Sequence, residues 1–425
     1  MTDLLRFATA GSVDDGKSTL IGRLLYDSKS VFQDQLESVE RTSADRGDDY
    51  TNLALLTDGL RAEREQGITI DVAYRYFSTP RRSFIVADTP GHVQYTRNMV
   101  TGASTADLAL VLVDARKGVV EQTRRHASLS ALLRVPHLVL AVNKMDLVGW
   151  DRAVFDRIVA DFVAFAERLH SAPEFAGRLP DVVAVPIAAL HGDNVVDRSP
   201  QTPWYDGPTL LEHLETVEVD RDEAHTRSAR FPVQYVIRPM STERPDYRGY
   251  AGTLASGRLR PGDEVVVLPS GRRSTVATID TFDGELEQAL PGQAVTVRLA
   301  DEVDVSRGDL LAAADDAPTP VSTFEATVCW MAEAPLTPGR RLLVKHTTRT
   351  AKAMVTALRD RLDVTTLAHE PVERLELNDI GRVTLRTASL LAVDPYAVDR
   401  RTGAFILLDE GTGGTVAAGM VAGPA

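Results

Sequence analysis

The stretch GSVDDGKSTL, from Gly11 to Leu20, holds the pattern Gly-x4-Gly-Lys-Ser directly after an apolar run, LLRFATA. The pattern predicts a phosphate-binding loop between a strand and a helix. Its glycines let the backbone wrap closely round phosphates, and the helix N-terminus points N–H groups at the anion. The Lys17 ammonium would reach the β- and γ-phosphates of a nucleotide, and the Ser18 hydroxyl would be a ligand of Mg²⁺. The stretch therefore predicts a nucleotide-binding domain.

Nearly continuous apolar runs of strand length follow this loop. They are SFIVADTPG, DLALVLVDA, HLVLAVNKMD and DVVAVPIAAL. Runs of this kind are typical of strands that are buried on both faces of a parallel sheet. The segments between them have helical character, most clearly from Asp151 to Leu169, where apolar residues recur along one helical face. Residues 1–219 are therefore predicted to form an α/β P-loop domain with a doubly wound, mostly parallel sheet.

The second half of the chain has the pattern of β-structure. We interpret the charged stretch from Asp220 to Arg230 as a linker. From Phe231 onward short alternating strands are separated by glycine turns, which is typical of barrels and sandwiches. The proline-containing stretch AADDAPTPVST marks a second boundary. We predict two all-β barrel domains, over residues 228–315 and 321–425.

Composition limits the function classes. The 425 residues are 44% apolar and 25% charged, as in ordinary soluble proteins, and no apolar run is long enough to span a membrane. The N-terminus lacks the features of a signal peptide, and the single cysteine, Cys329, can form no internal disulfide or thiolate cluster. We therefore expect a cytoplasmic protein. The net charge of −13 argues against a large nucleic-acid interface, which needs clustered positive charge.

The motif NKMD, Asn143 to Asp146, indicates that the nucleotide is GTP or GDP. It ends a predicted buried strand, where ligands bind in open α/β sheets. The Asp146 carboxylate can accept hydrogen bonds from guanine N1–H and the 2-amino group, whereas adenine has neither donor and would leave the carboxylate unpaired. Lys144 would lie along the base, and Asn143 would tie this loop to the phosphate-binding loop.

Two further motifs predict a switch that responds to the γ-phosphate. In DTPGH, Asp88 would hold Mg²⁺ through a water, and the Gly91 N–H would sense the γ-phosphate. In GITI, Thr69 would be the second hydroxyl ligand of Mg²⁺, present only when the γ-phosphate orders its loop. With Ser18, these residues make up the predicted Mg²⁺ site.

The order of GSVDDGKS, GITI, DTPGH and NKMD resembles that of the translation-factor class of GTPases, exemplified by elongation factor Tu. The resemblance implies that His92 positions the attacking water or stabilises the transition state. It also implies that Val13 and Ile68 form an apolar gate that keeps His92 away until activation. The whole loop would bind GTP, with Thr19 at the α-phosphate: Gly11, Ser12, Val13, Asp14, Asp15, Gly16, Lys17, Ser18 and Thr19.

The fifth motif of this class, Ser-Ala-Leu/Lys, reads Ala188-Ala189-Leu190 in this chain. The Ala189 N–H can still bind the 6-oxo group of guanine, so we expect recognition of the base to survive. The missing serine hydroxyl removes a hydrogen bond that braces the loop, worth roughly 1 kcal/mol.

Longer stretches resemble one branch of the class, the GTPase subunits of bacterial sulfate adenylyltransferase (ATP sulfurylase). They include GSVDDGKSTLIGRLLYDSK, with Asp15 where elongation factors usually carry His, VIRPMSTERPDYRGYAGTLASGRLRPGD and TGAFILLDEGTGGTVAAGM. The resemblance implies a smaller catalytic subunit as partner, in a heterodimer or higher heteromer. That subunit would form adenosine 5′-phosphosulfate and pyrophosphate from ATP and sulfate, driven by GTP hydrolysis in this chain. Some relatives carry a fused adenylylsulfate kinase, which we do not expect here because the sequence contains no second phosphate-binding loop.

Two other functions remain open from the sequence. One is an elongation-factor-like GTPase that delivers aminoacyl-tRNA, and the other is a stand-alone regulatory GTPase with an unrelated protein partner. The acidic net charge and the branch-specific stretches favour the sulfate adenylyltransferase reading.

Overall fold

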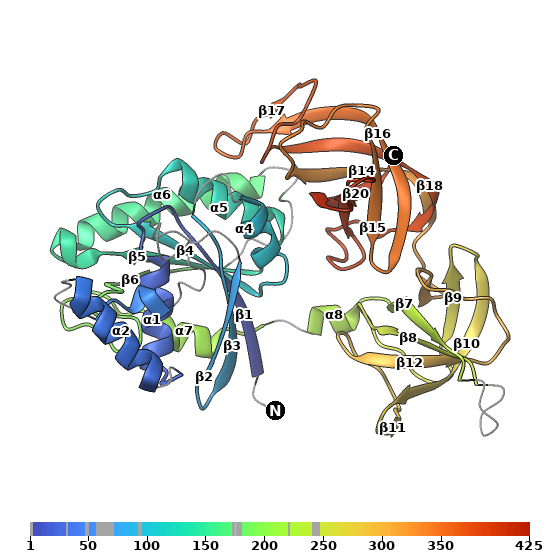
Figure 1. The fold of residues 1–425 in the computed structure, drawn as a ribbon, viewed down its shortest axis with the longest axis horizontal. Helices are drawn as coiled ribbons and strands as arrows, with labels where there is room; N and C mark the ends of the chain where they lie inside the picture. The colour runs from blue at the N-terminus through green and yellow to red at the C-terminus, as the bar shows by residue number, and fades with distance from the viewer. Residues whose placement is uncertain are drawn as a thin grey trace. The chain divides into compact units, whose positions relative to one another are not determined.

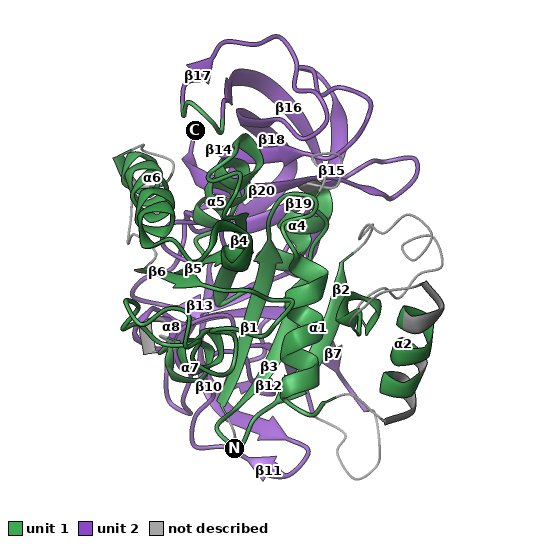
Figure 2. Ribbon diagram, turned by 90° about the vertical axis from the view of Figure 1, so that its left-hand side faces the viewer, with its two compact units in different colours: residues 1–219, 364–367 green, residues 220–363, 368–425 purple. Residues whose placement is uncertain are grey.

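The computed structural model describes residues 3–30, 33–46, 51–56, 72–91, 96–171, 175, 181–219, 222–239 and 247–425. The chain divides into two compact units, residues 1–219 with 364–367 and residues 220–363 with 368–425 (Figure 2). Each unit is described by itself below.

A six-stranded mixed sheet forms the centre of the first unit. Its strands lie in the order β2 (Ala73–Ser78), β3 (Arg82–Asp88), β1 (Asp3–Ala10), β4 (Leu108–Asp114), β5 (His137–Asn143) and β6 (Asp181–Pro186). Neighbouring strands are parallel except for β2, which pairs antiparallel with β3. Every residue of β4 and β5 is buried, as their continuous apolar runs predict.

Helices cover both faces of this sheet (Figure 1). They are α1 (Lys17–Asp27), α2 (Gln33–Arg46), α4 (Thr96–Ala103), α5 (Glu121–Leu132), α6 (Arg152–Ser171) and α7 (Leu210–Thr216), with 3-10 turns η1 (Leu53–Leu56) and η3 (Met145–Val148). Leu20 and Leu24 of α1 and Leu214 of α7 share one core cluster with Leu5 and Phe7 of β1. The prediction of a doubly wound α/β domain is confirmed.

The second unit contains two closed antiparallel barrels. The first barrel consists of β7 (Arg230–Ile237), β8 (Gly249–Thr253), β9 (Glu264–Leu268), β10 (Arg272–Thr281), β11 (Gly284–Glu285), β12 (Ala294–Leu299) and β13 (Leu310–Ala313). The second consists of β14 (Pro320–Trp330), β15 (Arg341–His346), β16 (Arg349–Leu362), β17 (His369–Glu370), β18 (Ile380–Ala392), β19 (Ala404–Leu408) and β20 (Thr415–Pro424). The pairings β9–β10 and β15–β16 close the two rings, so the prediction of two barrels is confirmed.

The stretch from Asp220 to Arg230, which we interpret as a linker, contains regular structure in its described part. Asp222–Thr226 forms a short helix, α8, and Arg230 begins β7. Arg230 is 5% exposed, and its side chain donates to Asp394, with Nε–Oδ2 and Nη2–Oδ1 distances of 3.0 Å. Because Asp394 is 164 residues away along the chain, the local run of charges could not reveal it.

No helix in the described part of the chain combines the length and the apolar character needed to cross a membrane.

Candidate functional site

The predicted nucleotide motifs meet at one edge of the α/β sheet. The phosphate-binding loop follows β1, DTPG ends β3, NKMD ends β5, and the Ala188-Ala189-Leu190 segment follows β6. These strands are parallel, so their carboxyl ends lie at the same edge, which is where open α/β sheets bind ligands.

Gly16 connects the loop to α1 in a conformation that favours glycine. Its φ is 94°, and a Cβ built on it would lie 2.4 Å from Asn143 Nδ2. Both the backbone conformation and the lack of space therefore require glycine at this position. The motif's second glycine is thus explained by the close approach of the NKMD segment.

Lys17 is buried, with its ammonium folded onto the loop. Nζ donates to the carbonyl oxygens of Gly11 at 2.7 Å and Ser12 at 3.0 Å. Burial lowers the Lys17 pKa, and the nearby carboxylates, Asp88 foremost, oppose that shift. A Cβ on Gly91 would lie 2.5 Å from Lys17 Nζ, so the DTPG segment passes directly beside this ammonium.

The start of α1 fits an anion. Its N-cap, Gly16, provides no side-chain cap, and the first turn contains no acidic residue. Ser12 Oγ is buried and has no hydrogen-bond partner among the described residues. By contrast, the side chains of Thr209 and Glu212 close the N-terminus of α7 in a capping box. The backbone N–H groups at the start of α1 are therefore those from which a nucleotide phosphate would accept hydrogen bonds.

The donor set beside this helix start also fits Mg²⁺, which prefers oxygen ligands. Ser18 lies in the first turn of α1, and the buried Asp88 carboxylate ends β3 close enough to Lys17 to act on its charge. The predicted ligand Thr69 lies outside the described residues, as do Ile68 and His92. Val13 lies within the described loop and is half-buried.

Asn143 joins three segments of the site. Its Nδ2 donates to the Asp15 carbonyl oxygen at 2.8 Å, and its Oδ1 accepts from the Ala189 N–H at 2.9 Å. The contact that we expect between NKMD and the phosphate-binding loop is therefore present. Because the Ala189 N–H is engaged by Asn143, its role towards the guanine 6-oxo group stays a prediction.

The segment after β6 is braced without the serine hydroxyl of the related motif. The Ala188 carbonyl oxygen accepts from the backbone N–H groups of His191 at 3.1 Å and Gly192 at 2.9 Å. Arg23 of α1 donates to the Leu190 carbonyl oxygen at 2.7 Å. These bonds hold the segment against the helix that begins at the phosphate-binding loop.

Asp146 and Lys144 lie on the same short segment. The Asp146 side chain is 25% exposed, and its Oδ2 lies 3.8 Å from His191 Nε2. Lys144 has a left-handed backbone, with φ of 63°, and its Nζ donates to the Asp14 carbonyl oxygen. The two side chains that we expect to contact guanine therefore lie on one short segment, with the Asp146 carboxylate partly exposed.

Sequence reasoning missed Asp114, which ends β4 at this same edge. Its carboxylate contacts Lys144 Nζ at 3.1 Å and Arg116 Nη2 at 2.6 Å. The sequence did contain a signal, because Asp114 is an acidic residue at the end of the apolar run DLALVLVD. This run forms β4, which lies between β1 and β5, the strands that the phosphate-binding loop and NKMD follow.

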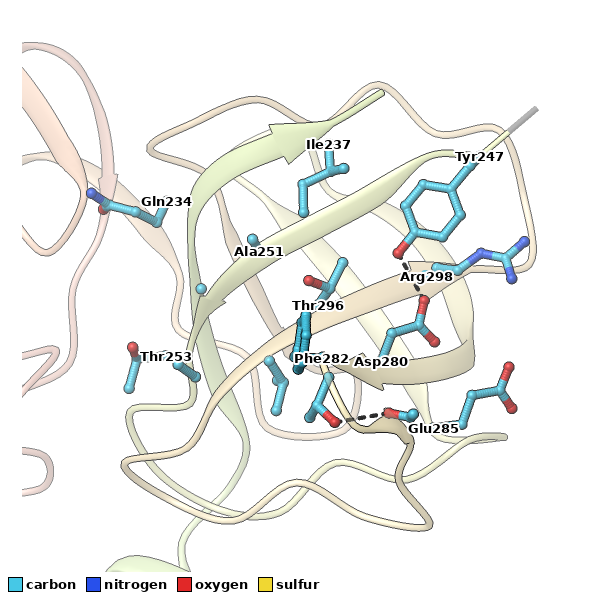
Figure 3. Close-up of a pocket in the computed structure, with 15 residues that line it drawn as sticks. Gln234, Ile237, Tyr247, Ala251, Thr253, Asp280, Phe282, Glu285, Thr296 and Arg298 are labelled. Atoms are coloured by element: carbon cyan, nitrogen blue, oxygen red, sulfur yellow. Dashed lines mark hydrogen bonds between the residues drawn. The ribbon is translucent and has the colours of Figure 1, made fainter. Parts of the chain in front are cut away.

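The first barrel has an open groove that is separate from these residues (Figure 3). Its volume is about 1080 Å³, and strands β7, β8, β10, β11 and β12 contribute to its lining. The Tyr247 hydroxyl donates to Asp280 at 2.8 Å, Arg298 lies over the Tyr247 ring, and Phe282 is fully exposed. None of the predicted nucleotide-site residues that the structure describes lines this groove.

Comparison with known proteins agrees with the geometry of the site. A family model described as the elongation factor Tu GTP binding domain matches residues 2–221, more than half of the chain. A model described as GTP-eEF1A C-terminal domain-like matches residues 323–422. The first match shows that the α/β unit is a guanine-nucleotide-binding domain.

Curated relatives match over nearly the whole chain. The bifunctional enzyme CysN/CysC of Mycobacterium tuberculosis (strain ATCC 25618 / H37Rv) is 62% identical, over 99% of this chain and 67% of the relative. Sulfate adenylyltransferase subunit 1 of Bacteroides fragilis (strain YCH46) is 52% identical, over 99% of this chain and 86% of the relative. The solved structure of sup35 complexed with GDP is 24% identical, with a TM-score of 0.43, over 99% of this chain and 94% of that one.

The curated sulfate adenylyltransferase subunits 1 are 51–52% identical to this chain over 99% of its length. The chain therefore belongs to the elongation factor Tu-like GTPases and, within them, to the sulfate adenylyltransferase subunit 1 family.

Proposed function

We propose that this chain is the GTPase subunit of a sulfate adenylyltransferase. GTP hydrolysis here would drive the formation of adenosine 5′-phosphosulfate and pyrophosphate from ATP and sulfate on a smaller catalytic subunit. The observation that carries the proposal is the Asn143 junction, which joins the phosphate-binding loop to the guanine motif in a chain 52% identical to a sulfate adenylyltransferase subunit 1.

The residues of the first unit would bind GTP through its phosphates and its base. The N–H groups at the start of α1 and the Lys17 ammonium would hold the phosphates, and Lys17 would leave the carbonyl oxygens of Gly11 and Ser12 to do so. Asp146 would accept from guanine N1–H and the 2-amino group. Ser18, Thr69 and Asp88 would hold Mg²⁺, which when bound neutralises negative charge on the β- and γ-phosphates.

Hydrolysis would proceed by attack of water on the γ-phosphorus. A bond from the water oxygen forms as the bond to the β–γ bridging oxygen breaks, which gives GDP and inorganic phosphate. His92 would orient the water, and the apolar gate of Val13 and Ile68 would hold His92 away until activation.

The γ-phosphate would act as the signal to the partner. Its loss would release Thr69 and Gly91, and the barrels would transmit this change to the catalytic subunit. The ATP and GTP that the reaction consumes and the single cysteine both support the cytoplasm as the place of action.

Reconstitution with the smaller subunit tests this function. The purified complex should release pyrophosphate from ATP and sulfate faster when GTP is present, and the isolated chain should hydrolyse GTP slowly. Equal rates with and without GTP would contradict the proposal. Recovery of the chain with tRNA and without an adenylyl-transferring subunit would favour the elongation-factor-like alternative.

His92→Ala tests the hydrolytic role within the same complex. We expect GTP hydrolysis to fall about a hundredfold or more, because a positioned group that orients or activates water contributes a factor of this size. GDP affinity should remain that of the wild type, since His92 acts on the water. Unchanged hydrolysis would show that another residue performs this role.

A further inference from the structure

Asp114 is a buried carboxylate with two cationic partners at the edge of the nucleotide site. Its side chain has no exposed area. Arg116 contacts it through two atoms, with Nε–Oδ1 at 3.0 Å and Nη2–Oδ2 at 2.6 Å, and Lys144 Nζ lies 3.1 Å from Oδ2. A buried carboxylate with this set of partners is fixed in position, because neither oxygen can turn away without losing a charge-assisted hydrogen bond.

The parallel register of two strands brings Asp114 to Lys144. Asp114 of β4 pairs with Asn143 of β5, and the Ala115 N–H donates to the Asn143 carbonyl oxygen at 2.8 Å. Lys144 follows Asn143 and extends its ammonium between the Asp114 carboxylate and the Asp14 carbonyl oxygen. Lys144 therefore spans from the guanine motif to the phosphate-binding loop.

We propose that Asp114 is the positioning residue for Lys144, holding its ammonium on the phosphate-binding loop so that its alkyl stem already lies where guanine binds. The proposal rests on the guanine-nucleotide site described above. Lysine has a flexible four-carbon stem that loses rotamer freedom when it is ordered. If Asp114 orders the stem before the nucleotide arrives, that loss does not weaken binding.

Asp114 is ionised in this arrangement. Burial would raise the pKa of the Asp114 carboxyl, but hydrogen bonds from Arg116 and Lys144 outweigh burial and hold that pKa well below its usual range. Arg116 is about half exposed and contacts Asp114 from the solvent side. Replacement of the Arg116 side chain should therefore leave the ion pair between Asp114 and Lys144 in place.

A double-mutant cycle on the full chain tests whether Asp114 acts through Lys144. The variants are Asp114→Asn, which is isosteric, Lys144→Met and the double variant, with Arg116→Gln as the control. The measurement is the affinity for GDP with Mg²⁺ by titration calorimetry. We expect Asp114→Asn to weaken GDP binding about five- to tenfold, the magnitude of one side chain that must be ordered on binding. In the Lys144→Met background the same change should alter affinity less than about twofold.

The outcomes separate positioning from a structural role. Equal losses from Asp114→Asn in both backgrounds, or no loss in the wild-type background, would overturn the proposal. Arg116→Gln should change affinity less than about threefold, since its cation is exposed and screened. If the Asn variant does not fold, Asp114→Ser replaces it in the cycle. If neither variant folds, Asp114 is a structural residue and the proposal fails.

A second nucleotide sharpens the test. Inosine diphosphate lacks the 2-amino group that Asp146 would read, whereas Lys144 lies along the ring of either base. Asp114→Asn should therefore weaken binding of GDP and inosine diphosphate by the same factor. A changed ratio would overturn the positioning role. Absence of GDP binding by the wild-type chain would instead contradict the proposed guanine site itself.

Discussion

Asp15 places a carboxylate inside a loop that is predicted to bind phosphates. The side chain is 2% exposed, and its Oδ2 accepts from the Ser12 N–H at 2.7 Å. Burial raises the pKa of this carboxyl, and the hydrogen bond from Ser12 with the charge of Lys17 opposes the rise. The hydrogen bond to Ser12 thus links the two ends of the segment from Ser12 to Asp15. The negative charge of Asp15 also attracts the Lys17 ammonium, which the phosphates would attract as well.

Asp15→Asn should bind GDP more tightly. The amide oxygen can still accept from the Ser12 N–H, while the loss of a buried negative charge near the phosphates should raise affinity about tenfold. Calorimetry with GDP measures this. Asp14→Asn is the matched control, because Asp14 is exposed and its left-handed backbone, with φ of 66°, suits asparagine. Unchanged or weaker binding by Asp15→Asn would contradict the charge argument.

The same variant should change the dependence of stability on pH. A carboxyl with a raised pKa in the folded state favours folding while it is protonated, and this contribution is lost as pH rises through the folded pKa. Asp15→Asn should therefore have the higher melting temperature at pH 7. The difference should shrink as pH falls towards the ordinary range of aspartate. A constant difference across pH would show that ionisation of Asp15 has no effect on stability.

Asp146→Asn should change the preferred nucleotide from one that contains guanine to one that contains xanthine. Asparagine offers an amide donor to the 2-oxo group of xanthine and leaves the donors of guanine poorly matched. GDP affinity should fall about a hundredfold or more, the size of effects from unpaired buried polar groups. Competition between GDP and xanthosine diphosphate measures the preference. A retained preference for GDP would mean that another residue reads the base.

At the scale of the element, α5 buries polar side chains that a core helix normally avoids. His126 is 2% exposed, its Nε2 lies 2.8 Å from Gln122 Nε2, and its Nδ1 has no partner among the described residues. Burial, together with the charges of Lys17 and Arg125, lowers the His126 pKa to about 3. The ring is therefore neutral in the folded protein at pH values where the unfolded chain protonates it.

This histidine should make the first unit sensitive to acid. Because its pKa is lower in the folded state, its contribution to stability is present above about pH 6.5 and is lost as pH falls towards 3. Between these two pH values the free energy of unfolding should decrease by about 1.4 kcal/mol for each unit by which the pH falls. Urea unfolding of wild type and His126→Asn at several pH values measures the difference in slope. Equal slopes would show that His126 titrates alike in both states.

The local pattern predicts some elements of this chain and misses others. The buried strands β4 and β5 have continuous apolar runs, whereas β2 is an edge strand with exposed Tyr74 and Tyr76 and was not predicted. The phosphate-binding loop could be predicted because its chemistry lies within one short motif. The contact of Asp114 with Lys144 depends on the register of two strands, which no single segment contains.

At the scale of the whole molecule, a buried ionic network joins the two barrels of the second unit. Arg230 of the first barrel pairs with Asp394, which follows β18 of the second. The Thr402 hydroxyl donates to Asp394 Oδ2 at 2.6 Å, and His346 Nε2 lies 2.6 Å from the Thr402 carbonyl oxygen. The barrels therefore share polar as well as apolar contacts within one unit.

Arg230→Met should destabilise the second unit by about 3–5 kcal/mol, because it leaves Asp394 charged, buried and without its cation. The combination with Asp394→Asn should recover much of this loss, since the buried charge is then gone. Urea unfolding followed by tryptophan fluorescence measures both. If the single and double variants were equally unstable, packing of the arginine stem rather than charge would hold the barrels together.

During synthesis the second barrel can close only after β20 is available. β20 (Thr415–Pro424) lies between β14 and β19 in the ring, so neither strand has its partner on that side until β20 has left the ribosome. A nascent chain that lacks β20 exposes two open strand edges, which are sites of aggregation. Residues 1–219, which make up most of the α/β unit, precede both barrels in the chain and can fold long before. Chains that stall on the ribosome or are truncated should therefore contain a folded nucleotide site and a second barrel that is still open. That barrel should depend on chaperones.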